Sequence, residues 1–162
     1  MKRSHDTPPQ DEPAGHDPLR DFSRSLPMLL LQAHQSVMAE FRPMLREHGI
    51  TEQQWRVLRA LSTADTLRIS QLASLTLISG PSLTRILRAL EERQLIRRRV
   101  ETGDQRAASI SLAAAGRHML KTVAPFSEAR YRGIEERLGA QDLDQLYRLL
   151  VGLPRRLKGR RA

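Results

Sequence analysis

The sequence predicts a mainly α-helical fold that contains one small β-hairpin. Apolar residues recur every three or four positions over most of residues 21–157, which is the spacing of one face of an α-helix. Residues 95–112 instead contain two short runs that mix β-branched or apolar residues with polar ones around a turn. Apolar residues make up 40% of the 162 residues, which is enough for one domain of ordinary size to bury a core.

The first helix is expected over residues 21–48, where apolar residues from Phe22 to Leu45 lie on one face. Pro43 should bend this helix near its end, because proline removes a backbone donor and crowds the preceding turn. Gly49 then provides a C-cap for the helix.

Two further helices are expected before residue 80. Thr51 followed by Gln54 is a capping box, so a second helix should begin there and run to about residue 62. Ser70 is the expected N-cap of a short third helix, after the polar stretch 63–68. A turn at residues 77–80 should follow this helix.

The fourth helix should begin at Pro81, whose missing amide donor does no harm in a first turn. Its leucines and isoleucine from Leu83 to Leu90 occupy the i, i+3, i+4 and i+7 positions of a buried stripe. The other surfaces of its N-terminal half therefore carry small, polar and cationic residues, namely Ser82, Thr84, Arg85 and Arg88. A hairpin of residues 95–100 and 109–112 should follow, and two last helices are expected over 113–138 and 142–157.

The formal net charge of +9 is unevenly distributed and indicates a polyanionic partner, either nucleic acid or an anionic membrane surface. Residues 1–20 carry four prolines and a net charge of −1, which predicts a disordered tail. The last nine residues, 154–162, hold five basic residues and no acidic one, and we expect a basic tail at 158–162. Such a run is equally well explained by a solvated surface.

A short helix, a turn, a second helix with a cationic N-terminal half and an arginine-rich hairpin follow one another within residues 70–112. This is the order of a winged helix-turn-helix domain, in which the second helix enters the major groove of double-stranded DNA. Each feature alone is more often an ordinary surface element, but their order favours DNA binding. Arg106 is expected to enter the adjacent minor groove, held by Asp104. The remaining candidate DNA contacts are Ser82, Thr84, Arg85, Arg88, Arg97, Arg98 and Arg99.

The hairpin residues Asp104-Gln105-Arg106, followed by Ser111-Leu112 and Gly116, resemble the wing signature of the MarR family of winged helix-turn-helix transcriptional regulators. Residues 25–43 and 48–59 are similar to the homoprotocatechuate-operon repressor branch of that family, and the resemblance covers residues 21–150. Ala113 stands where the family has a capping Thr or Ser, and Ser111 is the alternative cap.

The resemblance implies a homodimer formed by the first, fifth and sixth helices. Residues 21–50 and 113–157 would then form a dimerisation region, and residues 51–112 the DNA-binding domain. The leucine stripe of residues 143–153 and the long apolar face of residues 22–45 agree with this, because they exceed what a small winged domain covers alone. Two-fold symmetry predicts a pseudo-palindromic operator.

The resemblance also implies that a small phenolic or aromatic carboxylate releases the protein from DNA after binding between the first, second and fifth helices. Relatives often carry an arginine near positions 32–34, whereas this chain has Gln32 and His34, which favours a heteroaromatic or hydroxylated acid. A tryptophan at helical spacing is more often core, and an isolated histidine is more often solvated. The candidate ligand contacts are Gln32, His34, Ser36, His48 and Trp55.

Several classes of function find no support in the sequence. The absence of cysteine excludes disulfides, thiolate metal sites and thiol-based peroxide sensing. No glycine-rich phosphate loop, metal-ligand spacing or activated nucleophile is present, so we expect neither an enzyme nor a cofactor. No apolar run could span a membrane, which predicts a cytoplasmic, nucleoid-associated protein. The predicted function is a dimeric repressor of an aromatic-compound catabolic operon, and the alternative is a sequence-nonspecific nucleoid or RNA-binding protein that depends on its basic tail.

Overall fold

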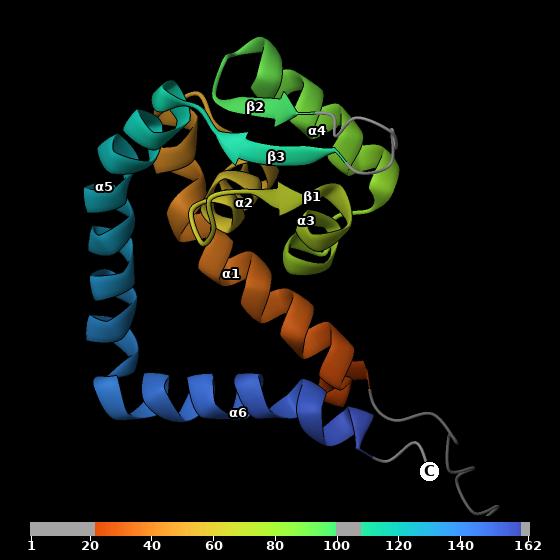
Figure 1. The fold of residues 1–162 in the computed structure, drawn as a ribbon. Coiled ribbons are helices and arrows are strands. Elements are labelled where there is room, and N and C mark those ends of the chain that lie inside the picture. The colour runs from red at the N-terminus through yellow and green to blue at the C-terminus, as the bar shows by residue number, and fades with distance from the viewer. Residues whose placement is uncertain (1–21, 100–107, 160–162) are drawn as a thin grey trace, which may run out of the picture. The chain divides into compact units, whose positions relative to one another are not determined.

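The computed structural model describes residues 22–99 and 108–159. The chain divides into two compact units, residues 1–36 and 37–162. The fold is mainly helical with a small antiparallel sheet, which confirms the predicted fold class (Figure 1). The elements are η1 (Phe22–Arg24), α1 (Leu26–Glu47), α2 (Glu52–Leu61), β1 (Leu67–Arg68), α3 (Ile69–Thr76), α4 (Gly80–Glu92), β2 (Ile96–Arg99), β3 (Ser109–Leu112), α5 (Ala114–Leu138) and α6 (Ala140–Lys158).

Local signals place the ends of the first two long helices as predicted. Gly49 adopts a left-handed conformation with φ of +64°, and its amide donates to the Arg46 carbonyl at 2.9 Å. Glycine suits this C-cap because it has no Cβ to clash in the left-handed region. The Thr51 hydroxyl accepts from the Gln54 amide at 3.2 Å, and the Thr51 amide donates to the Gln54 side chain at 3.1 Å. The capping box that begins α2 is therefore confirmed.

Two predicted helix caps are wrong. The helix α3 begins at Ile69, and its N-cap is Arg68, whose amide donates to the Gln71 side chain at 2.8 Å; Ser70 lies inside the helix. The N-cap of α5 is Ala113, and Ser111 lies in β3 instead of capping that helix. The Ala113 amide donates to the Leu95 carbonyl at 3.0 Å, so backbone holds this end of α5, and no side chain caps it.

The sheet contains a strand that the sequence did not predict. Its order is β1-β3-β2, with β3 paired antiparallel to both neighbours (Figure 1). The strand β1 has two residues, which is too short for an alternating pattern to show, and Leu67 in it is buried. The sheet therefore has a third strand in addition to the predicted hairpin.

The core of the second unit lies between the sheet and the helices α2, α4 and α5. Ile96 and Ile110 on the sheet are buried and belong to the same cluster as Leu58 of α2 and Leu83 of α4. Neither α6 nor η1 contains a buried residue among the described side chains. The helix α6 continues through Pro154 to Lys158, so part of the basic C-terminal run is helical.

The second half of α1 is joined to α5 by a two-point ion pair. Arg137 Nη2 lies 2.8 Å from Glu40 Oε2, and Arg137 Nη1 donates to Glu40 Oε1 at 3.1 Å. The hydrogen bond from Arg137 and the charge of that guanidinium lower the pKa of Glu40 below its ordinary value of 4.5.

We expect the substitution Glu40→Gln to reduce stability at neutral pH and to have a smaller effect in acid. Because the pKa of Glu40 is lower in the folded chain, its stabilising contribution is present above pH 4.5 and is lost as the pH falls through the folded value. Urea denaturation of both proteins at pH 7 and pH 3.5 measures this difference. Glu128→Gln is the control, because that exposed carboxylate on α5 forms no ion pair among the described residues. An equal loss for Glu40→Gln at both pH values would contradict the assignment.

Candidate nucleic-acid interface

A tight turn connects α3 to α4, and hydrogen bonds within α3 and from α2 fix its first residue. Thr76 ends α3, is buried, and its hydroxyl donates to the Leu72 carbonyl at 2.6 Å. Arg56 of α2 donates to the Thr76 carbonyl at 3.1 Å. Leu77 follows in the left-handed conformation with φ of 53°, and α4 begins at Gly80 with a proline in its first turn. The start of α4 is thereby fixed relative to α2 and α3.

The helix α4 presents a buried face and an exposed face, as predicted. Its apolar stripe, Leu83, Ile86, Leu87 and Leu90, is buried in the core. Thr84, Arg85 and Arg88 are exposed, and Ser82 is half-buried at the edge. The structure therefore brings these four predicted DNA contacts together on the outer surface of one helix.

The polar side chains of α4 differ in whether they already have hydrogen-bond partners within the described residues. Arg85 forms no hydrogen bond or ion pair with any described residue. Arg88 Nε donates to Glu92 Oε1 at 3.0 Å, and the Thr84 hydroxyl donates to the Gly80 carbonyl at 3.0 Å. Arg85 can thus bind an external acceptor with all of its donors, whereas Arg88 already uses one donor for Glu92, whose carboxylate also offsets its charge.

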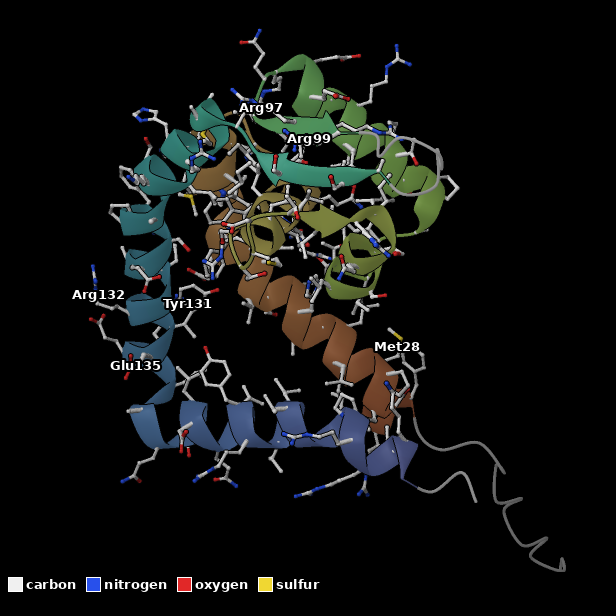
Figure 2. The ribbon with its side chains drawn as sticks, viewed as in Figure 1. Met28, Arg97, Arg99, Tyr131, Arg132 and Glu135 are labelled. Carbon is white, nitrogen blue, oxygen red and sulfur yellow. The ribbon has the colours of Figure 1, made fainter. Side chains whose placement is uncertain are left out.

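The three arginines of β2 are divided between the two faces of the sheet. Cross-strand partners lie on the same face, and Arg98 pairs with the fully buried Ile110. Arg97 and Arg99 pair with Ser111 and Ser109 on the opposite face. Figure 2 labels Arg97 and Arg99 in front of the sheet. Only Arg98 therefore shares the sheet face that packs on the core with α4. The predicted minor-groove residues Asp104 and Arg106 lie outside the described residues.

Two of the predicted ligand contacts, Trp55 and His48, belong to the second unit. Trp55 is almost buried in the core, and the guanidinium carbon of Arg59 lies 5.9 Å from the centroid of its ring. The ring of His48 lies 5.0 Å from that of Phe126, and His48 Nδ1 is 2.8 Å from the Met44 carbonyl oxygen. Arg59 is not among the residues predicted from the sequence, although its i, i+4 spacing from Trp55 places the two side chains on one face of α2.

The other three predicted ligand contacts belong to the first unit. Gln32, His34 and Ser36 are exposed on α1, and the Ser36 hydroxyl donates to the Gln32 carbonyl at 3.0 Å.

Phe41 in the second unit lies 5.0 Å from Tyr131 of α5, ring centroid to ring centroid, in an edge-to-face arrangement (Figure 2 labels Tyr131). Aromatic side chains of α1 and α5 therefore meet within the second unit.

Two other kinds of site are absent from the described residues. In this part of the chain, no helix is long and apolar enough to cross a membrane. Within residues 22–99 and 108–159, no three histidine or acidic side chains are grouped so that they could hold a metal ion.

Comparison with known proteins gives consistent matches. The family model described as "MarR family" matches residues 50–108. The HTH-type transcriptional regulator FarR of Neisseria gonorrhoeae is 36% identical over 84% of this chain and 93% of the relative. The homoprotocatechuate degradative operon repressor of Escherichia coli is 38% identical over 78% of this chain and 85% of the relative. The crystal structure of NadR in complex with 4-hydroxyphenylacetate is similar with a TM-score of 0.76 and 34% identity, over 83% of this chain and 98% of that chain.

Proposed function

Because the chain belongs to the MarR family of transcriptional regulators, we propose that it is a homodimeric repressor that binds a pseudo-palindromic operator and leaves it when a small aromatic acid binds. The observation that supports this most directly is the exposed face of α4, where Arg85 has no partner among the described residues. A helix of this kind fits the major groove, where arginine recognises guanine with two hydrogen bonds.

The substitution Arg85→Ala should weaken binding to the operator by about 1–3 kcal/mol, because one bidentate contact to a base is lost. The operator is first isolated from genomic DNA by its binding to the full chain. Competition between this fragment and a scrambled duplex then gives the specificity ratio for each variant. Arg132→Ala is the control, since it removes one charge from an exposed position on α5. An unchanged specificity ratio for Arg85→Ala would show that Arg85 does not contact the bases of the operator.

Exposed leucines on the helices outside the winged domain support a dimer. The helix α6 carries a set of large apolar side chains that are at least 40% exposed, namely Leu146, Leu149, Leu150, Val151 and Leu157. In the first unit, the exposed apolar residues of α1 are Leu26, Leu29, Leu30 and Leu31. Contiguous exposed apolar surface is rare on monomers and marks an interface. A two-fold axis through such an interface would place two copies of α4 about 34–36 Å apart, one turn of DNA.

The proposed ligand contacts of the second unit are Trp55 and Arg59 of α2, and Phe126 and Tyr131 of α5. Aromatic rings and a guanidinium group supply the chemistry needed to bind an aromatic ring and its carboxylate. The relatives support an aromatic acid, because the NadR structure holds 4-hydroxyphenylacetate and the E. coli relative is named for homoprotocatechuate degradation. We therefore propose control of an aromatic-compound catabolic operon. Roles for His48 and for Gln32, His34 and Ser36 of the first unit stay predictions.

We expect Arg59→Ala to weaken the binding of 4-hydroxyphenylacetate by about tenfold or more, since a charge-assisted hydrogen bond contributes about 1.5–3 kcal/mol. Isothermal titration calorimetry of the full chain measures the dissociation constant, and Arg59→Lys should restore part of the affinity. Arg148→Ala, on α6, removes the same charge as a control. If Arg59→Ala and Arg148→Ala bind the acid equally well, Arg59 is not its carboxylate partner.

A further inference from the structure

A cationic hollow lies at the base of the hairpin. It belongs neither to the exposed face of α4 that we propose for DNA nor to the proposed aromatic-acid contacts. Its volume is about 510 Å³, and it is enclosed by the turn before β1, the strands β2 and β3, and the first turn of α5. Four arginines line it, Arg97, Arg98, Arg99 and Arg117, together with the hydroxyl-bearing residues Ser109 and Ser111. By the strand register, Arg97 and Arg99 share one face of the sheet and Arg98 lies on the other. All of these residues belong to the second unit, so the hollow is defined by one compact body.

The arginines of this hollow form no ion pair with any described residue that would neutralise their charge. Arg97 and Arg99 are two positions apart on one strand, which places their Cα atoms roughly 6–7 Å apart on the same face. Neither forms a hydrogen bond or an ion pair within the described part of the chain. Arg117 Nη1 donates to the Leu112 carbonyl at 2.7 Å, and its other donors stay available. Asp65 is the one carboxylate among the lining residues, so positive charge exceeds negative charge.

A second hollow of about 460 Å³ adjoins the first and differs from it in chemistry. The two share Asp65, Leu112 and Arg117 as lining residues. The second hollow extends over Leu61 and Leu120, and Lys121 lies one helical turn after Arg117 at its rim. A small molecule with an anionic group in the first hollow could thus extend an apolar or weakly polar part into the second.

We propose that this hollow binds the di- or triphosphate group of a small organic phosphate. A guanidinium group donates two parallel hydrogen bonds to phosphate oxygens, and serine hydroxyls add further donors. Several arginines around one hollow match an anion with several negative charges better than a single carboxylate. The arginines outnumber Asp65, so the net Coulombic attraction of the hollow grows with the charge of the anion.

The register of the sheet argues against duplex DNA as the occupant. Arg97 and Arg99 lie on the sheet face opposite to the one that carries Ile96 and Ile110, which pack into the core with α4. A duplex seated on the exposed face of α4 would therefore not lie against the sheet face that carries Arg97 and Arg99. A hollow bounded by a turn, a strand pair and a helix end is also shaped for a small molecule.

Calorimetric titration of the full chain with tripolyphosphate and with ATP, at constant ionic strength and without DNA, tests the proposal. The variant Arg97→Gln/Arg99→Gln removes two cations from the hollow. The matched control, Arg85→Gln/Arg88→Gln, removes two cations from α4, and circular dichroism checks that both variants fold. Tripolyphosphate measures the anionic group alone, and ATP adds an organic part that reaches toward the second hollow.

The proposal predicts saturable binding of one anion per chain, weakened at least tenfold in Arg97→Gln/Arg99→Gln and less than twofold in the control. Tighter binding of ATP than of tripolyphosphate would support a role for the second hollow. Absence of saturable binding, or an equal loss in both variants, would overturn the proposal. A loss of operator affinity in Arg97→Gln/Arg99→Gln that matches the loss in the control would instead assign these arginines to DNA. Because the titrations contain no DNA, their outcome does not depend on the proposed repressor function.

Discussion

Replacing Gly116 by alanine should destabilise the folded chain by about 3 kcal/mol, the upper part of the usual range for an overpacked site. A Cβ at this position of α5 would lie 2.0 Å from the Leu95 carbonyl oxygen and 3.0 Å from the carbonyl carbon. That carbonyl cannot easily move, because it accepts the Ala113 amide at 3.0 Å and the Leu95 amide donates to Leu90 at 2.9 Å. Glycine is needed here for close approach of two backbones.

A matched substitution in the same helix should have the opposite effect. A Cβ at Gly133 would have Arg137 Nη2 as its nearest neighbour, 4.0 Å away. Gly133→Ala should therefore stabilise the chain by about 0.5–1 kcal/mol, because alanine favours the helix. Urea denaturation followed by circular dichroism, at one protein concentration, measures both variants. Equal stabilities for Gly116→Ala and the unsubstituted chain would contradict the close packing of α5 against Leu95.

The substitution Leu150→Glu should convert the proposed dimer to monomers. Leu150 is 41% exposed on α6, within the leucine stripe of that helix. In a two-fold interface each substitution occurs twice, and burying each unpaired charge costs at least about 2 kcal/mol. The two together weaken association by about 4 kcal/mol, which is about a thousandfold in the dissociation constant.

Sedimentation equilibrium of the full chain measures the dimer dissociation constant directly. Gln145→Glu is the control, because it adds the same charge at an exposed position off the leucine stripe of α6. A monomeric Leu150→Glu protein should also lose most of its affinity for an inverted repeat and keep its weaker affinity for a single half-site. If Leu150→Glu remains a dimer at the concentrations at which the unsubstituted chain does, the interface lies elsewhere.

Features that depend on neighbouring residues were predictable from the sequence. The capping box of Thr51 and Gln54, the left-handed cap at Gly49 and the proline in the first turn of α4 each act within about four residues. The buried stripe of α4 follows from the helical period alone, and so does the exposure of Arg85. The winged helix-turn-helix order is therefore recognisable in the sequence alone.

Features that depend on distant segments were not predictable. The strand β1 exists because two residues pair with β3, more than forty residues later in the chain. The separation of Arg98 from Arg97 and Arg99 follows from the pairing register, which a run of three arginines does not reveal. The requirement for glycine at position 116 arises from the Leu95 carbonyl in another element. The sequence patterns predicted α4 and its exposed cationic face, and tertiary contacts determined the surroundings of the other candidates.

Selection of duplexes from a random pool by the full chain tests whether two copies of α4 read an inverted repeat. We expect the selected duplexes to share an inverted repeat whose half-sites are centred about 10–10.5 base pairs apart, one turn of the DNA helix. We also expect Arg85→Ala to relax the preference at defined positions of each half-site. If the chain instead retains duplexes that share no sequence and binds them all with similar affinity, α4 does not read an inverted repeat. That result would favour nonspecific binding through the basic residues of the C-terminal run.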